Sequence, residues 1–364
     1  MKKNLLLLIM FFMFYGCMNQ INSFEKKDIQ YQVSIVMVGD NLIHKTIYQS
    51  VAYDNYNFKP IYQEIKPYIK SFDLAFINQE TILGGKEIGL SSYPTFNSPY
   101  ELGDALVDTG FNLISLANNH TLDRGEKAVI NSVNYWLKQP VVFSGSCLSI
   151  DESQVKFFEK NTIKFAFIAY TYGTNGIFHP NGKTYLANIY SDEKALLDLA
   201  ELKKTVDIII VSMHWGEEYS SLPNQEQKRQ AYFLSSLGVD IIIGHHPHVI
   251  QPIDIISNDN HQTIVIYSLG NFLSDQVGIN RLIGIATSLN ITKEVKKTVN
   301  NNLFSSLSID NINAKLLFRY KDENKNFTIK WFNSLNNHLL MNYELYLEEK
   351  KQLIQTFHPH IKVE

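Results

Sequence analysis

The chain has little cysteine, with two in 364 residues, Cys17 and Cys147. This excludes a disulfide framework of the kind that holds small secreted domains together, so stability has to come from an apolar core and from any bound metal. Basic residues are not in excess either, because 33 Lys and Arg oppose 36 Asp and Glu, giving a formal net charge of −3. Since a polyanion is held by a positive field, nucleic acid is not expected as a partner.

The N-terminus lacks an apolar run long enough to cross a bilayer. The run Leu5–Phe14 is shorter than the roughly 20 residues that a transmembrane helix needs. Two lysines precede it and Gly16-Cys17 follows it, a pattern typical of a lipoprotein signal peptide over residues 1–17. We therefore expect Cys17 to be the lipid attachment residue and the protein to lie, lipid-anchored, at the extracytoplasmic face of the cell membrane.

Two features of the N-terminal region qualify this expectation. Phe14 and Tyr15 stand where a usual lipobox has leucine and a small residue, so ordinary secretion and an uncleaved anchor remain alternatives to lipidation. Residues 18–32 are polar, rich in Asn, Gln and Lys, and show no hydrophobic period. They are predicted to form a flexible tether between the anchor and the folded part of the chain.

Five apolar runs of the chain end in polar residues. From Val33 onward, apolar runs rich in β-branched residues alternate with segments of helical period, which predicts repeated βα units and a largely parallel sheet. The carboxyl ends of parallel strands face the ligand crevice, so polar residues there indicate a site rather than core. The five endings are Gly39-Asp40, Asn78-Gln79-Glu80, Asn118-Asn119-His120, His214-Trp215 and Gly244-His245-His246-Pro247-His248.

Capping signals predict the bounds of two helices. Ser98-Pro99-Tyr100-Glu101 predicts a helix start with Ser98 as N-cap and proline at the first helical position, and Gly110 predicts its end. A second helix is predicted over residues 225–237, because Gly238 is a typical left-handed terminator.

The length of the chain suits one α/β domain with extensions. We predict that the domain covers residues 33–290, and that residues 291–364 form a C-terminal extension with too little apolar content to carry a core alone. Alternation of apolar and polar residues predicts a hairpin around residues 322–326 of this extension, and a helix over residues 343–357.

The strand ends supply the side chains that divalent metals need. Neutral imidazoles and anionic or amide oxygens, converging on one point, hold ions that activate water. The candidate ligands are Asp40, Glu80, Asn119, His214, His246 and His248. A carboxylate such as Glu80 can bridge two ions, and a pair about 3.5–4 Å apart clamps a phosphoryl or carbonyl group. The ligand types suit Mn, Fe or Zn.

Two further residues are candidates for catalysis. His120 directly follows the candidate ligand Asn119 and fits a general acid or an oxyanion stabiliser. Asp123, three residues further on, is placed to orient the imidazole of His120.

Several motifs carry a family resemblance between Val33 and Ser288. They are GD at 39–40, NQE at 78–80, ANNHTLDRG at 117–125, MHWGEEY at 213–219, GHHPHV at 244–249 and YSLGNF at 267–272. With these motifs in this order, the chain resembles the CapA type of poly-γ-glutamate capsule-synthesis proteins. That family is similar to the calcineurin-like metallophosphoesterases.

The resemblance implies an α/β fold of the metallo-dependent phosphatase type, a four-layer αββα sandwich with two metal ions between its sheets. By the same resemblance, Asp40 and His248 would bind the first ion and Glu80 would bridge. Asn119, His214 and His246 would hold the second ion.

The sequence also departs from the phosphoesterase pattern. Leu42 stands two positions after Asp40, where those enzymes have a second histidine ligand, and Glu80 replaces an aspartate at the bridging position. His44 would reach the first ion only if the segment turns helically. These departures leave phosphoesterase activity open.

Other polar and aromatic residues have competing interpretations. His245 is expected to be a wall residue rather than a ligand, and the C-terminal pair His358 and His360 is expected at the surface, because it follows a helix. Tyr219, like Trp215, either stacks on substrate or roofs the strand end. Arg281 either meets an anionic substrate or makes an ordinary surface ion pair.

Two functions compete on these residues. The anchor signal and the family resemblance favour a membrane-tethered protein in the synthesis, export or anchoring of poly-γ-glutamate or a related capsule polymer. Its partners would be that anionic polymer, the membrane, and membrane proteins of a capsule-synthesis complex. The ligand set favours a metal-dependent phosphoesterase or amide hydrolase acting on an envelope polymer. We take capsule synthesis or export as the process and leave catalysis open.

Overall fold

The computed structural model describes residues 29–258, 261–297 and 303–364. The expected signal peptide, its Cys17 and residues 18–28 of the expected tether lie outside these ranges. Residues 31–292 and 307–364 form one compact unit, which carries every candidate site residue of the described chain. The other unit is described only at residues 29–30, 293–297 and 303–306, where Gln30 bonds to Glu294 over 3.3 Å.

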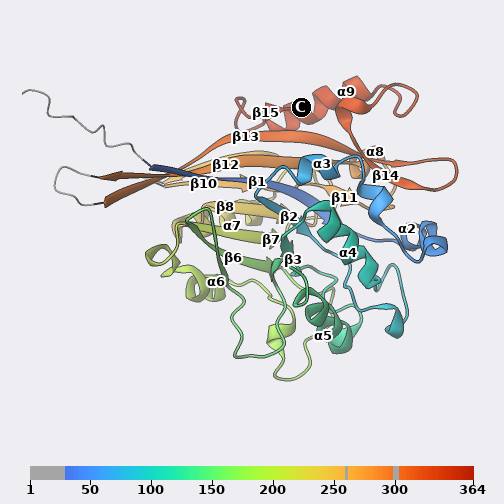
Figure 1. Ribbon diagram of the computed structural model, residues 1–364, viewed down its shortest axis with the longest axis horizontal. Coiled ribbons are helices and arrows are strands. Elements are labelled where there is room, and N and C mark those ends of the chain that lie inside the picture. The colour runs from blue at the N-terminus through green and yellow to red at the C-terminus, as the bar shows by residue number, and fades with distance from the viewer. Residues whose placement is uncertain (1–28, 259–260, 298–302) are drawn as a thin grey trace, which may run out of the picture. The chain divides into compact units, whose positions relative to one another are not determined.

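The first sheet joins the two ends of the chain (Figure 1). Its strands follow the order β14 (Phe327–Trp331), β13 (Leu303–Lys321), β12 (Ile283–Lys297), β1 (Ile29–Asn41), β2 (Leu74–Asn78), β3 (Leu113–Ser115) and β4 (Val142–Ser144). In addition, β11 (Asn271–Leu273) pairs with β1, and β15 (Lys362–Val363) pairs with β13. The strands from β1 to β4 run parallel, as predicted.

The second sheet is formed by the middle of the chain. Its order is β5 (Lys156–Lys160), β6 (Ile163–Thr171), β7 (Ile208–His214), β8 (Ile241–His245), β10 (His261–Ile266) and β9 (Ile253–Asn258). The central strands are parallel, and the two edge strands pair antiparallel.

The two sheets pack face to face through apolar side chains. Val33, Ile35 and Met37 of β1 point into the core between the sheets, where they join Phe167 of β6 and Ile210 of β7. Burying each such side chain contributes about 1.5–3 kcal/mol. Because side chains alternate along a strand, the neighbours of these β1 residues face the opposite side of the sheet and need a second cover.

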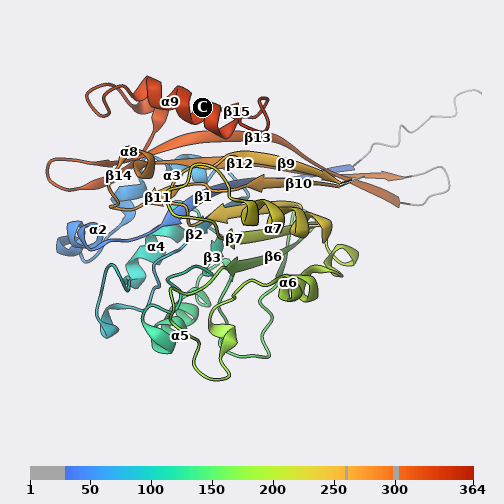
Figure 2. The same cartoon turned by 180° about the vertical axis from the view of Figure 1, so that it is seen from behind.

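Helices provide that cover on both outer faces. The helices α2 (Lys45–Ser50), α3 (Lys66–Ile69), α4 (Tyr100–Thr109) and α5 (Gly125–Trp136) pack on the first sheet, and α6 (Asp192–Leu199) and α7 (Gln225–Ser236) pack on the second, as seen from behind in Figure 2. The fold is therefore an αββα sandwich, which confirms the expected fold class.

The C-terminal segment is built into the first sheet. The strand β12 runs through residue 290, where the sequence suggested a boundary, and the predicted hairpin is present between β13 and β14. The predicted helix is α9 (Tyr343–Ile354). After it, His358 bonds to Asp254 over 2.9 Å and is half-buried, whereas His360 is exposed, and neither belongs to a group of possible metal ligands in the described chain. A short helix, α8 (Ile279–Leu282), precedes β12.

Two local predictions were wrong. The strand β1 begins at Ile29, so residues 29–32 of the expected tether are strand, because the polar side chains there do not prevent backbone pairing. The N-cap of α4 is Pro99, since the hydroxyl of Ser98 bonds to the hydroxyl of Thr81 over 2.9 Å instead. The predicted end of α7 is confirmed, with Gly238 at a φ of 84°. None of the helices within the described ranges has the length and apolarity to span a bilayer.

Candidate metal centre

The polar residues at the strand ends converge between the two sheets. Asp40 and Asn78 are neighbours in the register of β1 and β2, and His214 and His245 are neighbours in β7 and β8. The side-chain amide of Asn78 donates to Asp40 over 2.8 Å and lies 3.5 Å from Nδ1 of His214. The site therefore forms where the carboxyl ends of both sheets face each other, as parallel strands predict.

One group of possible ligands comprises Asp40, Glu80 and His248. Each residue offers one ligand atom, and these atoms lie within 4.8 Å of one another. Nδ1 of His248 is 3.2 Å from Asp40 and also lies 3.1 Å from the amide oxygen of Asn271, while Nε2 is 3.8 Å from Glu80. All three members of the group are buried.

The remaining predicted ligands lie beside this group. Nε2 of His214 is 3.0 Å from the amide oxygen of Asn119 and 3.7 Å from Glu80. The ring of His246 lies 4.8 Å from that of His214, centroid to centroid. The structure thus brings together all six residues predicted as ligands, with Glu80 next to members of both predicted halves of the site.

Burial sets the protonation of these groups. Burial lowers the pKa of His214 well below its usual value, and lowers that of His246 to about 3. Burial also opposes protonation of His248, but the neighbouring carboxyl groups of Glu80 and Asp40 outweigh this and raise its pKa to about 9. Neutral imidazoles are the form that binds metal, so His214 and His246 are poised as ligands.

Several buried polar atoms of the site lack a partner. Among the described residues, neither carboxylate oxygen of Glu80 and neither ring nitrogen of His245 has a hydrogen bond, and Nδ1 of His246 has none. Burial raises the pKa of Glu80 well above its usual value. Unpaired buried groups of this kind are costly, and a cation between Glu80 and the imidazoles would satisfy them. The donor set therefore fits a divalent metal.

Replacing Glu80 with glutamine is expected to stabilise the metal-free protein at pH 7 by about 1–3 kcal/mol. Because the folded-state pKa of Glu80 is raised, the unfolded chain releases a proton that the folded chain retains. The gain should be absent below about pH 4.3, the ordinary glutamate pKa, and should grow as the pH rises. Urea unfolding of chelator-treated protein between pH 4 and 8 measures it. Exposed Glu152→Gln is the control, and an equal gain there would contradict the assignment.

The loop after β8 holds its histidines in an unusual backbone conformation. His246 has a φ of 96° and His248 a φ of 59°, in a region that residues with a side chain rarely adopt. The amide of His246 donates to Asp40 over 3.2 Å, which ties the loop to β1. Such conformations cost roughly 1–3 kcal/mol each and persist where the surroundings impose them, often at functional sites.

His120 and Asp123 form a pair next to the cluster. Nδ1 of His120 lies 2.8 Å from Oδ2 of Asp123, which also accepts a hydrogen bond from the amide of Phe96 over 2.6 Å. The carboxylate of Asp123 can only accept, so it fixes the proton of His120 on Nδ1 and leaves Nε2 unprotonated in the neutral ring. This is the orienting contact that the sequence predicted.

The structure decides between the competing interpretations of His44, His245 and Trp215. Nδ1 of His44 faces the backbone of Leu42 and Asp275, at 3.1 and 3.2 Å, and His44 belongs to neither group of possible ligands in the described chain. His245 stacks on Phe76 with its Nδ1 3.4 Å from Asp40, as expected of a wall residue. The indole of Trp215 is buried and donates to the backbone, so it is a structural residue.

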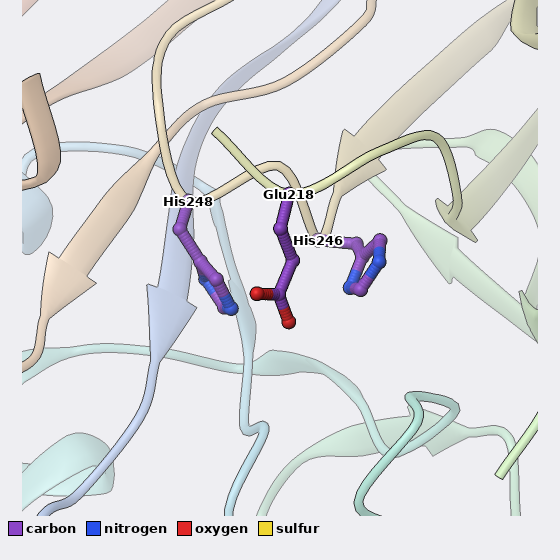
Figure 3. A group of neighbouring side chains, drawn as sticks. All are labelled: Glu218, His246 and His248. Atoms are coloured by element: carbon purple, nitrogen blue, oxygen red, sulfur yellow. The ribbon is translucent and has the colours of Figure 1, made fainter. Parts of the chain in front are cut away.

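Two residues of the site, Glu218 and Asn271, were not among the predicted ligands. Glu218 forms a second group of possible ligands with His246 and His248, again with ligand atoms within 4.8 Å (Figure 3). The available signal was the pair of glutamates in the motif at 213–219, close to the histidines in the fold although not in the chain. Asn271, which lies in the motif at 267–272, is the second, because its amide oxygen is 3.1 Å from Nδ1 of His248.

The fold and the cluster define a two-sheet αββα protein with a histidine and carboxylate site suited to divalent metals. The family described as "Bacterial capsule synthesis protein PGA_cap" matches residues 34–276. The chain therefore belongs to this family of bacterial capsule synthesis proteins, which confirms the resemblance read from the motifs.

Individual relatives agree with this membership. The chain is 29% identical over 254 residues to "PGA biosynthesis protein CapA" of Bacillus subtilis, covering 67% of this chain and 64% of that protein. It is 27% identical to "Capsule biosynthesis protein CapA" of Bacillus anthracis, covering 67% of this chain and 60% of that protein. The chain thus spans less than two thirds of the length of these relatives.

Among solved structures, the similarities are weaker. The 5'-nucleotidase precursor from Thermus thermophilus aligns with a TM-score of 0.41 and 11% identity, covering 88% of this chain and 59% of that protein.

Proposed function

We propose that this protein is a lipid-anchored, extracytoplasmic component in the synthesis, export or anchoring of poly-γ-glutamate or a related anionic capsule polymer. Membership of the capsule synthesis family supports this process, as do the printed names of the two CapA relatives. The N-terminal sequence, with Cys17 after a short apolar run, supports the anchor.

The proposal includes two divalent ions, Mn, Fe or Zn, at the candidate metal centre. The observation that carries it is that the six predicted ligands lie together, with the buried carboxylate of Glu80 3.7 Å from His214 and 3.8 Å from His248. Asp40, Glu80 and His248 would hold one ion, and Asn119, His214 and His246 the other, with Glu80 between them. When bound, such ions lower the pKa of water toward neutrality and polarise phosphoryl or carbonyl groups.

Capsule production by cells tests this role. In a strain that lacks the gene, the wild-type chain should restore the surface polymer, whereas Glu80→Ala and His246→Ala should not. Exposed Glu152→Gln controls for expression. Full restoration by both site variants would show that the metal centre has no part in the process.

A second candidate function is hydrolysis or transfer at a phosphoester or amide bond. The pairing of His120 with Asp123 favours it, because a neutral imidazole with a fixed proton can hold or move a proton at its Nε2. The His120 residue is only 6% exposed, so bulk water is kept away from this proton transfer.

Under this second function, His120→Ala is expected to reduce turnover by roughly 100-fold or more while leaving metal content unchanged. Asp123→Asn should have a smaller effect, because it alters the orientation of His120 without removing the imidazole. Turnover of model phosphodiesters and of γ-glutamyl amides, normalised to bound metal, gives the measurement. If His120→Ala loses neither activity nor capsule, His120 has no catalytic role.

A further inference from the structure

An exposed carboxylate lies over the buried part of the metal centre. The side chain of Glu218 reaches between the imidazoles of His246 and His248 (Figure 3). The two imidazoles are buried, with exposures of 5% and 1%, whereas Glu218 is exposed. Nδ1 of His246 has no hydrogen-bond partner among the described residues, so this side of the cluster holds a donor atom that the protein itself leaves unused.

The backbone fixes Glu218 in this place. The next residue, Tyr219, has a φ of 67°, and its amide donates to the carbonyl of Pro247 over 2.8 Å, between the two histidines. Further along the chain, the side-chain amide of Gln251 donates to the carbonyls of Ser220 and Leu222, at 2.9 and 3.1 Å. The segment that follows Glu218 is therefore held at three residues, one of them in a costly conformation, which points to an imposed backbone position.

A cationic group lies over the residue that follows Glu218. The guanidinium of Arg281 lies over the ring of Tyr219, 4.5 Å from its centroid, and the Tyr219 ring is 6.3 Å from that of His248. Burial, together with the nearby carboxylate of Glu218, raises the pKa of the Tyr219 hydroxyl. Tyr219 therefore lies between the positive charge of Arg281 and the rim of the metal centre.

We propose that Glu218 is a displaceable metal ligand. In the resting protein its carboxylate adds a ligand to the metal centre on the side of His246 and His248. It yields that place to an oxyanion of the substrate, a carboxylate or phosphate, that Arg281 helps to hold. Asp40 and Glu80 are buried, so neither carboxylate could be solvated after it left a metal ion. The exposed carboxylate of Glu218 can return to solvent at little cost. This inference rests on the metal centre proposed above.

The first test measures Mn²⁺ binding to the full chain by calorimetry. Glu218→Gln should weaken binding at one position by roughly tenfold or more, because an amide is a poorer ligand than a carboxylate. Glu217→Gln removes the adjacent exposed charge, which lies in neither group of possible ligands in the described chain, and should bind Mn²⁺ as the wild type does. Equal affinities for both variants would overturn the assignment of Glu218 as a ligand.

The second test uses inorganic phosphate and L-glutamate as probes of the Mn²⁺-loaded protein. Without the competing carboxylate, Glu218→Gln should bind at least one probe several-fold more tightly than wild type, and the probe that gains shows whether the site takes phosphate or carboxylate. Arg281→Gln should weaken the same probe. If neither probe gains in Glu218→Gln, displacement is wrong.

The two proposals fail in different ways. If the wild type binds no Mn²⁺, the metal centre and the inference are both wrong. If wild type binds Mn²⁺ and Glu80→Gln loses it, while Glu218→Gln retains full affinity, only the role of Glu218 is overturned.

Discussion

His248→Ala is expected to cause a large loss of metal affinity at the candidate metal centre. Among the described residues, His248 is the one shared by the two groups of possible ligands, and its two nitrogens lie near Asp40 and Glu80. Loss of a residue that orients a metal ligand already costs about 10–100-fold in affinity, so removal of the shared imidazole should cost more than about 100-fold. Titration of the chelator-treated chain with Mn²⁺ or Zn²⁺ measures the loss.

His44→Ala is the matched control for this prediction. It removes an imidazole from the neighbouring segment, but one whose Nδ1 faces backbone rather than the cluster. We expect metal affinity to stay within about threefold of wild type. The opposite pattern, with His44→Ala losing metal and His248→Ala retaining it, would show that the first ion sits elsewhere than the geometry indicates.

Gly39→Ala is expected to have the largest effect on stability. A Cβ atom at Gly39 would lie 1.8 Å from the carbonyl oxygen of Gly270, and the amide of Asp40 donates to that same oxygen over 3.0 Å. The substitution therefore has to push β1 away from the segment before β11, which costs the packing and a buried hydrogen bond together. We expect a loss of roughly 3–5 kcal/mol in the free energy of unfolding, together with loss of metal affinity.

Gly173→Ala controls for glycine substitution as such. A Cβ atom there meets nothing within 4 Å, and the backbone of Gly173 is not in the left-handed region. Its free energy of unfolding in urea should stay within about 0.5 kcal/mol of wild type. Comparable stability of both variants would contradict the close approach of the two chain segments at Asp40.

The buried part of the site could be predicted from the sequence, because the carboxyl ends of parallel strands lie at one edge of a sheet. Apolar runs such as Ile208–Met213 mark buried strands, and the parallel arrangement brings whatever follows them to one edge. The six predicted ligands and the pair His120 and Asp123 are therefore found together. The alternation of apolar runs and helical segments likewise predicted an α/β fold. The four-layer arrangement was predicted from the family resemblance.

The features that the sequence did not predict depend on contacts between residues that are far apart in the chain. Glu218 sits over the cluster because the amide of Tyr219 bonds to Pro247, a contact that no local pattern encodes. Ser98 would be a normal N-cap, but Thr81 competes for its hydroxyl. The polar start of β1 at Ile29 is strand because it pairs, and pairing of a polar segment leaves no hydrophobic period in the sequence.

Binding of divalent metal by the converging strand ends can be measured in the purified protein. Elemental mass spectrometry compares the full chain, purified without chelator, with Glu80→Ala and His246→Ala. We expect one or two transition-metal ions per wild-type chain and their loss in both variants. A wild-type chain that stays metal-free after incubation with Mn²⁺ and Zn²⁺ would contradict it.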